Sequence, residues 1–353
     1  MPLIRPARLT MCHYGFPHTD TATIEANNPV IRVFYGDTAF ELHPGESLLD
    51  GLLRQGVAIP HGCKTGSCQS CLLKCREGLI PAESQKDLKK AHQLNDYFLA
   101  CQCVPQGEMQ VAPPNVTGEQ LKATIKELKL LAPEIMEVSL EPHREISYRA
   151  GQFIRLYHPT GPARNYSLAS VPSLDVDLIL HVRKHANGTL SSWVHHDLNV
   201  GENVTISDAL GDFFYVSEYA HQPLLLIGAD TGLAPLFGIL RDALQQGHQA
   251  PIHLFHEAKD LDGLYLLDDF NLIAKSYPNV SYTACVSDSN AKTPSGIRSG
   301  RASDIALASH PDLKGWLVYL CGHPDMVRWT QMQTFLANAA LSDIHMDPFE
   351  TQL

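Results

Sequence analysis

The stretch HGCKTGSCQSC, residues 61–71, decides how this chain is interpreted. It places Cys63, Cys68 and Cys71 within nine residues, and Cys101 follows after 29 further residues. Three thiolates close together and a fourth from a distant segment can enclose two iron ions, and this spacing is one that binds a [2Fe–2S] cluster. The two glycines of the stretch allow the backbone to bend round a cluster and to direct N–H groups at its sulfurs.

Two other cysteines compete for the ligand positions. The sequence over residues 99–105 resembles the Leu-x-Cys-x-x-x-Pro stretch in which plant-type ferredoxins place their fourth ligand, and this resemblance selects Cys101 over Cys103. Cys75 is expected to pack as a small hydrophobic residue on the strand after the loop. The alternative is a structural zinc site, but zinc sites usually use two Cys-x2–4-Cys pairs, and Cys101-x-Cys103 is too short. One departure from the ferredoxin pattern is Gln69, where a small residue is usual.

The composition excludes several classes of protein. The chain has 353 residues, enough for two to three domains, with 44% hydrophobic residues and a formal net charge of -11. Such an acidic chain is a poor candidate for binding nucleic acid through its overall charge. No segment approaches the ~20 apolar residues of a membrane span, and residues 1–25 lack the apolar core of a signal peptide. We therefore expect the nine cysteines to lie in a reducing cytoplasm, where metal ligation is more common than disulfide formation.

The order of predicted elements divides the chain into three domains after an extension over residues 1–29. Residues 30–35 and 38–42 predict a hairpin, Ser47 begins a short amphipathic helix, and residues 109–112 predict a closing strand. These elements and the cysteine loop predict a β-grasp ferredoxin domain over residues 30–113, of α+β class. The Pro-Pro pair at 113–114 predicts a linker.

The remaining sequence changes character near residue 218. Residues 118–217 are rich in alternating strands with Gly and Pro between them, which predicts an antiparallel β-barrel. Residues 223–228 form a nearly all-apolar run, typical of a strand buried on both faces. Strands and helices then alternate, so residues 218–353 are predicted to form an α/β domain with a parallel sheet.

A candidate flavin segment lies in the predicted barrel. Arg164, Tyr166 and Ser167 could provide a cation for a pyrophosphate, an aromatic face for the flavin ring and a hydroxyl near its N5. Gly188 and Ser191 lie at the start of a predicted helix, whose N-terminus suits a phosphate. Each piece alone is weak, because an Arg-x-Tyr-Ser strand is more often an ordinary surface strand. Their order, directly before a nucleotide-type domain, favours the functional interpretation.

A candidate nicotinamide segment follows. Gly228, Thr231 and Gly232 lie between the buried strand and a helix, where backbone amides can approach a pyrophosphate. The segment is not the Gly-x-Gly-x-x-Gly motif of standard dinucleotide sites. Cys321 and Gly322 end a later buried strand and so face the crevice where open α/β sheets bind ligands, although an inert core thiol is the alternative for Cys321.

Together the three segments resemble the ferredoxin–NADP⁺ reductase superfamily and, more narrowly, the iron–sulfur flavoprotein reductases of bacterial oxygenases. This resemblance covers about residues 30–350 and implies FAD, a [2Fe–2S] cluster and NAD(P)H as cofactors. It also implies an aromatic residue near the C-terminus beside the flavin, for which Phe349 is the candidate. Asp230 departs from the family, which usually has glycine there. The implied cofactor-binding residues are Arg164, Tyr166, Ser167, Val182, Gly188, Ser191, Gly228, Thr231, Gly232, Cys321, Gly322 and Phe349, of which Tyr166, Ser167 and Cys321 are also the catalytic candidates.

The predicted function is electron transfer from NAD(P)H through FAD and the cluster to a protein acceptor, an oxygenase component or its ferredoxin. Glu257 favours NADH, because an acidic group can accept a hydrogen bond from a ribose 2′-OH, whereas Lys259 leaves NADPH possible. Two alternatives remain open. The acceptor could belong to another system, such as a deoxysugar dehydratase, or the chain could be a non-catalytic electron carrier with vestigial nucleotide sites.

Overall fold

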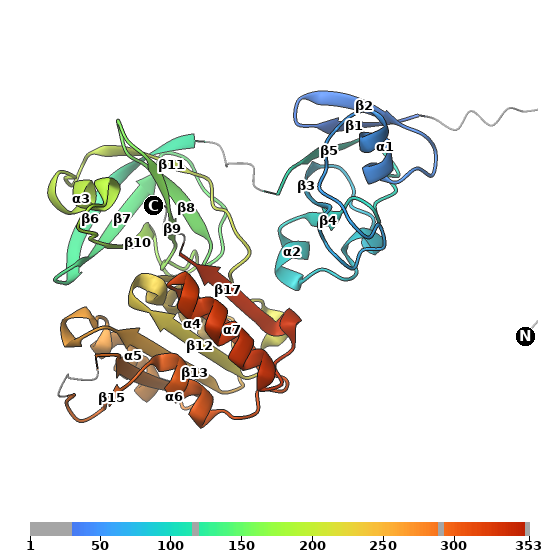
Figure 1. The fold of residues 1–353 in the computed structure, drawn as a ribbon. Helices are drawn as coiled ribbons and strands as arrows, with labels where there is room; N and C mark the ends of the chain where they lie inside the picture. The colour runs from blue at the N-terminus through green and yellow to red at the C-terminus, as the bar shows by residue number, and fades with distance from the viewer. Residues whose placement is uncertain (1–29, 115–119, 289–292, 350–353) are drawn as a thin grey trace, which may run out of the picture.

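The computed structural model describes residues 30–114, 120–288 and 293–349, so the predicted extension over residues 1–29 lies outside the described part. These residues form three sheets that follow one another along the chain (Figure 1). The three-domain fold class predicted from the sequence is confirmed: a mixed ferredoxin sheet, an antiparallel sheet and a parallel sheet. No helix in the described ranges is both long and apolar enough to cross a membrane.

The ferredoxin domain has a five-stranded sheet in the order β2-β1-β5-β3-β4. Strand β1 pairs antiparallel with β2 and parallel with β5, the arrangement of a β-grasp fold. Helix α1 begins after Ser47, whose hydroxyl accepts from the Asp50 N–H at 3.2 Å, and it buries Leu48, Leu49 and Leu52 against the sheet. The elements are β1 (Ile31–Tyr35), β2 (Thr38–Leu42), α1 (Leu48–Arg54), β3 (Leu72–Glu77), η1 (Ala82–Gln85), α2 (Lys90–Leu94), β4 (Tyr97–Leu99) and β5 (Met109–Ala112).

The second domain is an antiparallel sheet in the order β10-β7-β6-β11-β8-β9. A bridge between Leu168, which follows β9, and Leu180 in β10 joins the two edges and closes the sheet into a barrel. Alternate residues of each strand face an apolar interior. The elements are β6 (Gln120–Ala132), β7 (Ile135–Pro142), β8 (Phe153–Tyr157), β9 (Ala163–Ser167), β10 (Leu178–Arg183), α3 (Thr189–His196), β11 (Asn203–Ser207) and η2 (Ser217–Tyr219).

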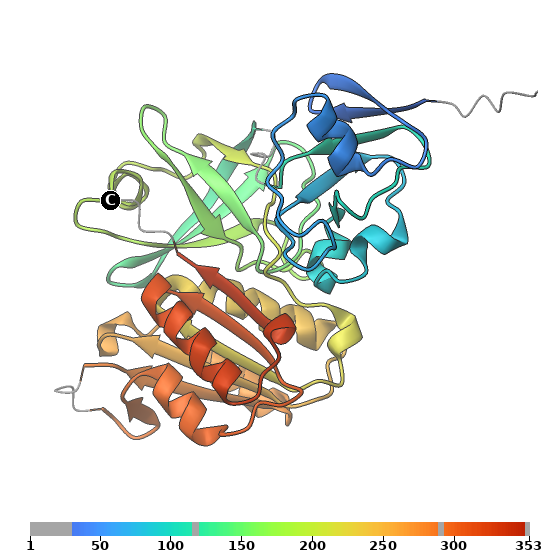
Figure 2. The same ribbon diagram turned by 45° about the vertical axis from the view of Figure 1, so that its right-hand side comes forward.

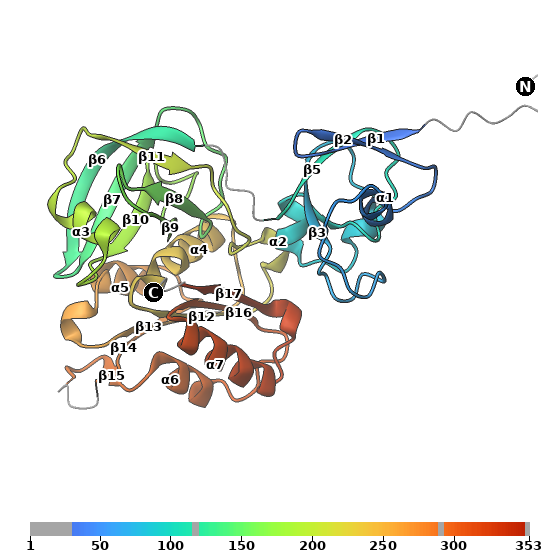
Figure 3. The ribbon, with the colours of Figure 1, turned by 45° about the horizontal axis from the view of Figure 1, so that its top comes forward.

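The third domain is a parallel sheet in the order β15-β14-β13-β12-β16-β17. Helices α4 and α5 cover one face and α6 and α7 cover the other, as Figure 3 shows, and a separate apolar core lies under each pair. The elements are β12 (Leu224–Ala229), η3 (Asp230–Gly232), α4 (Leu233–Gln245), β13 (Ile252–Ala258), η4 (Leu261–Gly263), α5 (Leu267–Ser276), β14 (Val280–Val286), β15 (Ile297–Ser299), α6 (Ala302–Ser309), β16 (Leu317–Gly322), α7 (Pro324–Leu336), η5 (Leu341–Asp343) and β17 (Ile344–Pro348).

The barrel and the parallel sheet lie against each other, and the ferredoxin domain sits beside both (Figure 2). The tip of β17 reaches toward the barrel, while α2 is the part of the ferredoxin domain nearest the other two (Figures 1 and 3). We therefore expect the functional side chains to lie where β17 and α2 approach the neighbouring domains.

Candidate functional site

The cysteine loop is shaped around the sulfur of Cys63. The backbone N–H groups of Thr65 and Cys68 donate to this sulfur at 3.3 Å, and the N–H of Cys63 donates to the Cys68 sulfur at 3.4 Å. Hydrogen bonds from Thr65 and then from Cys68 lower the pKa of the Cys63 thiol to about 6. Thiolate charge is thus favoured where a metal would need it. Positive φ angles at Lys64, Gly66 and Gln69 produce the bend.

The loop accommodates Gln69, which departs from the ferredoxin pattern. Its φ is 53°, and its amide donates to the Asp87 carbonyl at 3.0 Å. A long side chain at this position links the loop to the segment before α2. The loop itself is exposed at Cys63 and Cys68, so this side of the domain is open to a partner protein.

The four proposed ligands are arranged as two neighbouring thiol pairs, Cys63 with Cys68 and Cys71 with Cys101. Within the described ranges, no three Cys, His, Asp or Glu side chains converge as they would on a single metal ion. Two pairs match the geometry of a two-iron cluster, in which two thiolates hold each iron. Cys103 is fully buried in the ferredoxin core, where burial raises its pKa to about 12. This environment supports Cys101 as the fourth ligand.

The flavin candidates lie on β9, at one edge of the barrel sheet. Arg164 and Tyr166 point to one side of the strand, and Ser167 points to the other. The Arg164 guanidinium donates to its neighbour's carbonyl at 2.9 Å and is partly exposed, and the ring of Tyr166 packs against the barrel core. A cation and an aromatic ring therefore share one face, which fits a flavin nucleotide.

The phosphate candidates lie at the start of α3, which begins at Thr189. Gly188 is the N-cap, and a Cβ there would lie 2.4 Å from the Ser191 hydroxyl, so a larger residue would displace that side chain. The Ser191 hydroxyl donates to the Gly188 carbonyl and accepts from the His185 N–H, so it shapes the turn. Val182 is fully buried in the barrel core, and its carbonyl lies 2.9 Å from Nε2 of His195.

The glycine loop after β12 approaches the end of β16 closely. A Cβ on Gly232 would lie 2.4 Å from the Cys321 carbonyl oxygen, so no larger residue fits there. Asp230, unusual in this position, forms an ion pair with Arg183 of the barrel. Its charge is thereby balanced, and the pair ties the second domain to the third beside Thr231.

Asp347, which no motif in the sequence indicates, contacts both Ser167 and Cys321. The Ser167 hydroxyl donates to the Asp347 carboxylate at 2.7 Å, and the Cys321 sulfur lies 3.6 Å from the same oxygen. Burial raises the pKa of Asp347, while its hydrogen bonds to Ser167 and Cys321 lower it, and the net direction is upward. Burial likewise raises the pKa of Cys321, so this thiol is protonated and can donate.

Cys321 is fully buried, and its thiol is protonated and directed at Asp347. It lies at the carboxyl end of β16, and Gly322 next to it has a φ of 137°, which favours glycine. Phe349 packs partly buried against the core of the third domain, and its N–H donates to the Gly322 carbonyl at 2.9 Å. The predicted Ser167, Cys321, Gly322 and Phe349 thus lie together through β17.

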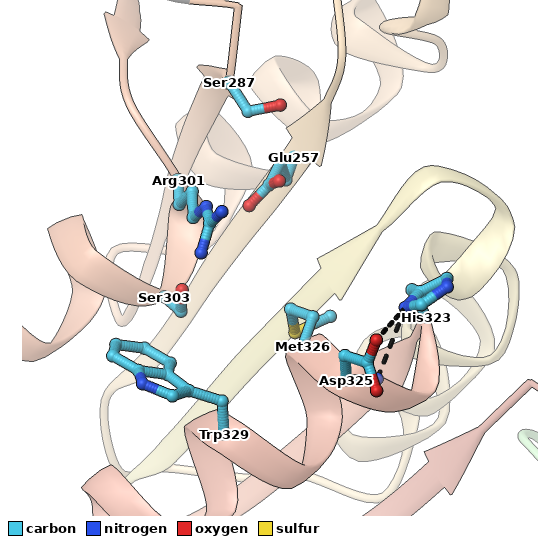
Figure 4. Close-up of a pocket in the computed structure, with 8 residues that line it drawn as sticks. All are labelled: Glu257, Ser287, Arg301, Ser303, His323, Asp325, Met326 and Trp329. Carbon is cyan, nitrogen blue, oxygen red and sulfur yellow. Dashed lines mark hydrogen bonds and ion pairs between the residues drawn. The ribbon is translucent and has the colours of Figure 1, made fainter.

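A cavity of about 590 Å³ opens at the carboxyl ends of the parallel strands (Figure 4). This edge is where open α/β sheets bind nucleotides. Ser303 lines the cavity, and its buried hydroxyl makes no hydrogen bond within the described residues, which leaves it available to a ligand. The lining residues are Glu257, Ser287, Arg301, Ser303, His323, Asp325, Met326 and Trp329.

The site therefore combines an iron–sulfur loop, a flavin-type barrel and a nucleotide-type sheet. Three family models match in this order: a 2Fe-2S iron-sulfur cluster binding domain at residues 35–106, an oxidoreductase FAD-binding domain at 123–215 and an oxidoreductase NAD-binding domain at 226–332. The chain belongs to the family of iron–sulfur flavoprotein reductases with ferredoxin, FAD and NAD domains in that order.

Its relatives include reductase components of bacterial oxygenases. The reductase subunit of an aromatic O-demethylase from Amycolatopsis sp. is 32% identical over 307 residues, which cover 84% of this chain and 91% of that protein. The phenol hydroxylase P5 protein of Acinetobacter pittii is 30% identical, over 88% and 92% of the two chains. The crystal structure of the Amycolatopsis cytochrome P450 reductase GcoB, 30% identical, superposes with a TM-score of 0.64 and covers 90% of this chain and 98% of that chain.

These findings confirm the predicted enzyme class and cofactors. The chain is an oxidoreductase of the ferredoxin–NAD(P)⁺ reductase type, with domains for FAD, a [2Fe–2S] cluster and NAD(P)H. When bound, NAD(P)H would supply a hydride to FAD, and the cluster would accept the two electrons from FAD one at a time.

Proposed function

We propose that this chain is the NADH-dependent reductase component of an oxygenase system. The observation that supports it most is the meeting of Ser167 and Cys321 on Asp347, because it joins the proposed flavin face to the proposed nicotinamide face. The relatives named above serve oxygenases and hydroxylases, which favours the same class of acceptor here. The proposed domain limits are 30–113, 118–217 and 218–353.

Each residue of the proposed site has a task that follows from its position. Arg164 and the start of α3 at Gly188 would hold the FAD pyrophosphate, and Tyr166 would lie against the flavin ring. The loop over residues 228–232 would bind the nicotinamide nucleotide pyrophosphate. Asp347 accepts from the Ser167 hydroxyl and the Cys321 thiol, and would thereby hold both side chains beside the proposed flavin and nicotinamide positions.

The cavity in Figure 4 supports NADH as the preferred donor. Glu257 lines it, and one carboxylate oxygen accepts from the Ala302 N–H at 2.8 Å, which fixes the side chain at the cavity wall. A fixed carboxylate repels the 2′-phosphate of NADPH but accepts from a ribose 2′-OH. Lys259, which kept NADPH open in the sequence analysis, is absent from the described lining, whereas Arg301 is part of it. Arg301 is thus the cation in the cavity lining that is available to a phosphate group of the nucleotide.

The exposed cluster loop supports a protein acceptor that docks at Cys63 and Cys68, and we propose an oxygenase component or its ferredoxin. We also propose a cytoplasmic location, because the eight cysteines in the described part of the chain are free and the thiolate ligands need a reducing compartment.

A donor comparison tests the cofactor preference. We expect kcat/KM for reduction of a dye to be at least about tenfold higher with NADH than with NADPH, a difference of about 1.4 kcal/mol. Glu257→Gln should narrow that ratio, while Lys259→Ala should leave it unchanged. Equal use of both donors by the parent protein would contradict the NADH assignment.

The acceptor is tested by reconstitution. The purified reductase, NADH and the oxygenase component of the aromatic O-demethylase or phenol hydroxylase system should together support substrate oxygenation above the level without reductase. A reductase that reduces a dye rapidly but supports neither oxygenase would contradict this choice of partners.

A further inference from the structure

We propose that α2 of the ferredoxin domain is the positioning element that docks the cluster onto the flavin and nicotinamide domains. The inference rests on electron transfer through both cofactors, and it does not depend on the NADH preference or on the acceptor. The donor and acceptor cofactors lie on different domains, so their separation is set by how these domains pack. Interfaces between domains are often mobile unless specific contacts hold them.

Three polar contacts join the α2 region to both other domains. The Lys89 ammonium donates to the Ile344 carbonyl in β17 at 2.8 Å, and the Asn95 amide donates to the Gly211 carbonyl at 2.8 Å. His92 forms an ion pair with Asp212. These residues come from both ends and the middle of one five-residue helix, so the helix is fixed in position and in rotation.

The centre of this contact is apolar and closely packed. Ala91 is 1% exposed and packs with Phe214 and Val216, which are also buried. An ion pair between Lys90 and Glu218, at 3.0 Å, lies at the edge. An apolar centre with a polar rim is the usual organisation of a specific interface.

The surroundings of His92 and Asp212 favour the charged form of the carboxylate. Burial would raise the pKa of Asp212, but the hydrogen bond from His92, with Lys89 and His345 nearby, brings it below its ordinary value. Lys89, Asp212 and His345 also line a small cavity of about 160 Å³ between the domains. The Asp212 carboxylate is therefore charged, and nitrogen atoms of Lys89, His92 and His345 lie around it.

Short links connect α2 to the proposed cluster ligands. Strand β4 follows α2 directly and leads to Cys101. The cluster loop is attached from its other side by the Gln69 hydrogen bond to Asp87. In addition, the Gln85 amide donates to the Tyr97 carbonyl at 2.8 Å and ties η1 to β4. A shift of α2 therefore moves the cluster.

The groups that α2 contacts lie on segments that also carry the proposed hydride-transfer site. Ile344 and Asp347 lie on the same short strand, β17. The Gly211 carbonyl that binds Asn95 also accepts from Gln152 at 2.8 Å, next to β8 of the barrel. The helix thus contacts the elements that position Ser167 and Cys321, and it is not docked on a remote surface.

The test is a stopped-flow experiment on the holoenzyme without oxygen. We expect the triple variant Lys89→Ala, His92→Ala, Asn95→Ala to keep its FAD and iron content and its rate of flavin bleaching by NADH. Bleaching of the cluster should slow by about tenfold or more, the scale expected when reacting groups are misplaced by an ångström. The control Glu83→Ala, Lys86→Ala removes an exposed ion pair one turn before α2 and should change neither rate.

A charge reversal gives a second, milder test. Lys90→Glu should slow the cluster step, and adding Glu218→Lys should restore it. Cluster bleaching at the parent rate in the triple variant would overturn the proposal. So would an equal loss of both rates, because α2 would then serve only to keep the other domains folded. The rates of the parent protein test the electron route itself. Failure of that route can therefore be distinguished from failure of the α2 docking proposal.

Discussion

Asp347 shows why single residues of this site are hard to find in the sequence. It stands in the segment IHMDPF, which has no motif of its own, and its role depends on β17 lying beside β16. Ser167 and Cys321 are 154 residues apart in the chain, so only the folded structure shows that one carboxylate binds both. Arg164, Gly188 and Gly232, by contrast, could be predicted because each lies in a local turn or strand pattern.

Asp347→Asn tests this role. We expect the rate of flavin reduction by NADH to fall by roughly tenfold to a hundredfold, because the neutral amide oxygen is a weaker acceptor than the carboxylate for the Ser167 hydroxyl and the Cys321 thiol. The measurement is the loss of flavin absorbance after rapid mixing. Asp343→Asn, on the preceding η5, is the matched control and should keep the parent rate. A parent-like rate in the Asp347 variant would contradict the assignment.

The fourth cluster ligand is decided by two serine variants. Cys101→Ser should abolish the cluster absorbance and leave NADH-to-dye activity, because the flavin path is intact. Cys103→Ser should keep the cluster, at some cost in stability, since it places a hydroxyl in an apolar core. Iron content and the visible spectrum check both. Loss of the cluster in the second variant alone would mean that Cys103 is the ligand.

At the scale of elements, the strongly patterned strands and helices were predictable and the connecting ones were not. Residues 223–228 predicted a buried strand, and the structure has β12 there. Helix α2 went unrecognised because it is short and polar, and its buried face contacts other domains. Helix α7 and strand β17 were also missed, since α7 is weakly amphipathic and β17 is an edge strand of mixed polarity.

A buried histidine on β13, His256, leads us to expect that the third domain loses stability in acid. His256 is fully buried, within 3.0 Å of the Tyr282 hydroxyl, and burial lowers its pKa to about 3. In the unfolded chain this pKa is about 6.5. Below pH 6.5 the unfolded state therefore binds a proton that the native state does not, and stability falls as pH drops toward 3.

The expected loss from His256 is up to about 2 kcal/mol between pH 7 and pH 5. His256→Gln removes this titration, so urea unfolding should depend less on pH in the variant, whatever its stability at pH 7. His221→Gln, at a more exposed position, should keep the parent slope. An unchanged slope in the His256 variant would show that this side chain does not contribute.

At the scale of the whole molecule, the order of domains was the most predictable feature. The cysteine spacing, the barrel pattern and the βαβ alternation are each local, and their sequence along the chain defines the family. How the domains meet was not predictable, because the contacts of Asp230 with Arg183 and of α2 with Asp212 join residues far apart in the chain. These contacts join the three domains to one another.

The most direct test of this electron route is rapid mixing of the purified protein with NADH in the absence of oxygen, with the visible spectrum recorded over time. We predict that the flavin and the iron–sulfur absorbance both bleach, the flavin first, because Ser167 and Cys321 meet on the flavin side while Cys63 to Cys101 lie on a separate domain. Bleaching of the flavin alone, or a cluster that is reduced before the flavin, would contradict it.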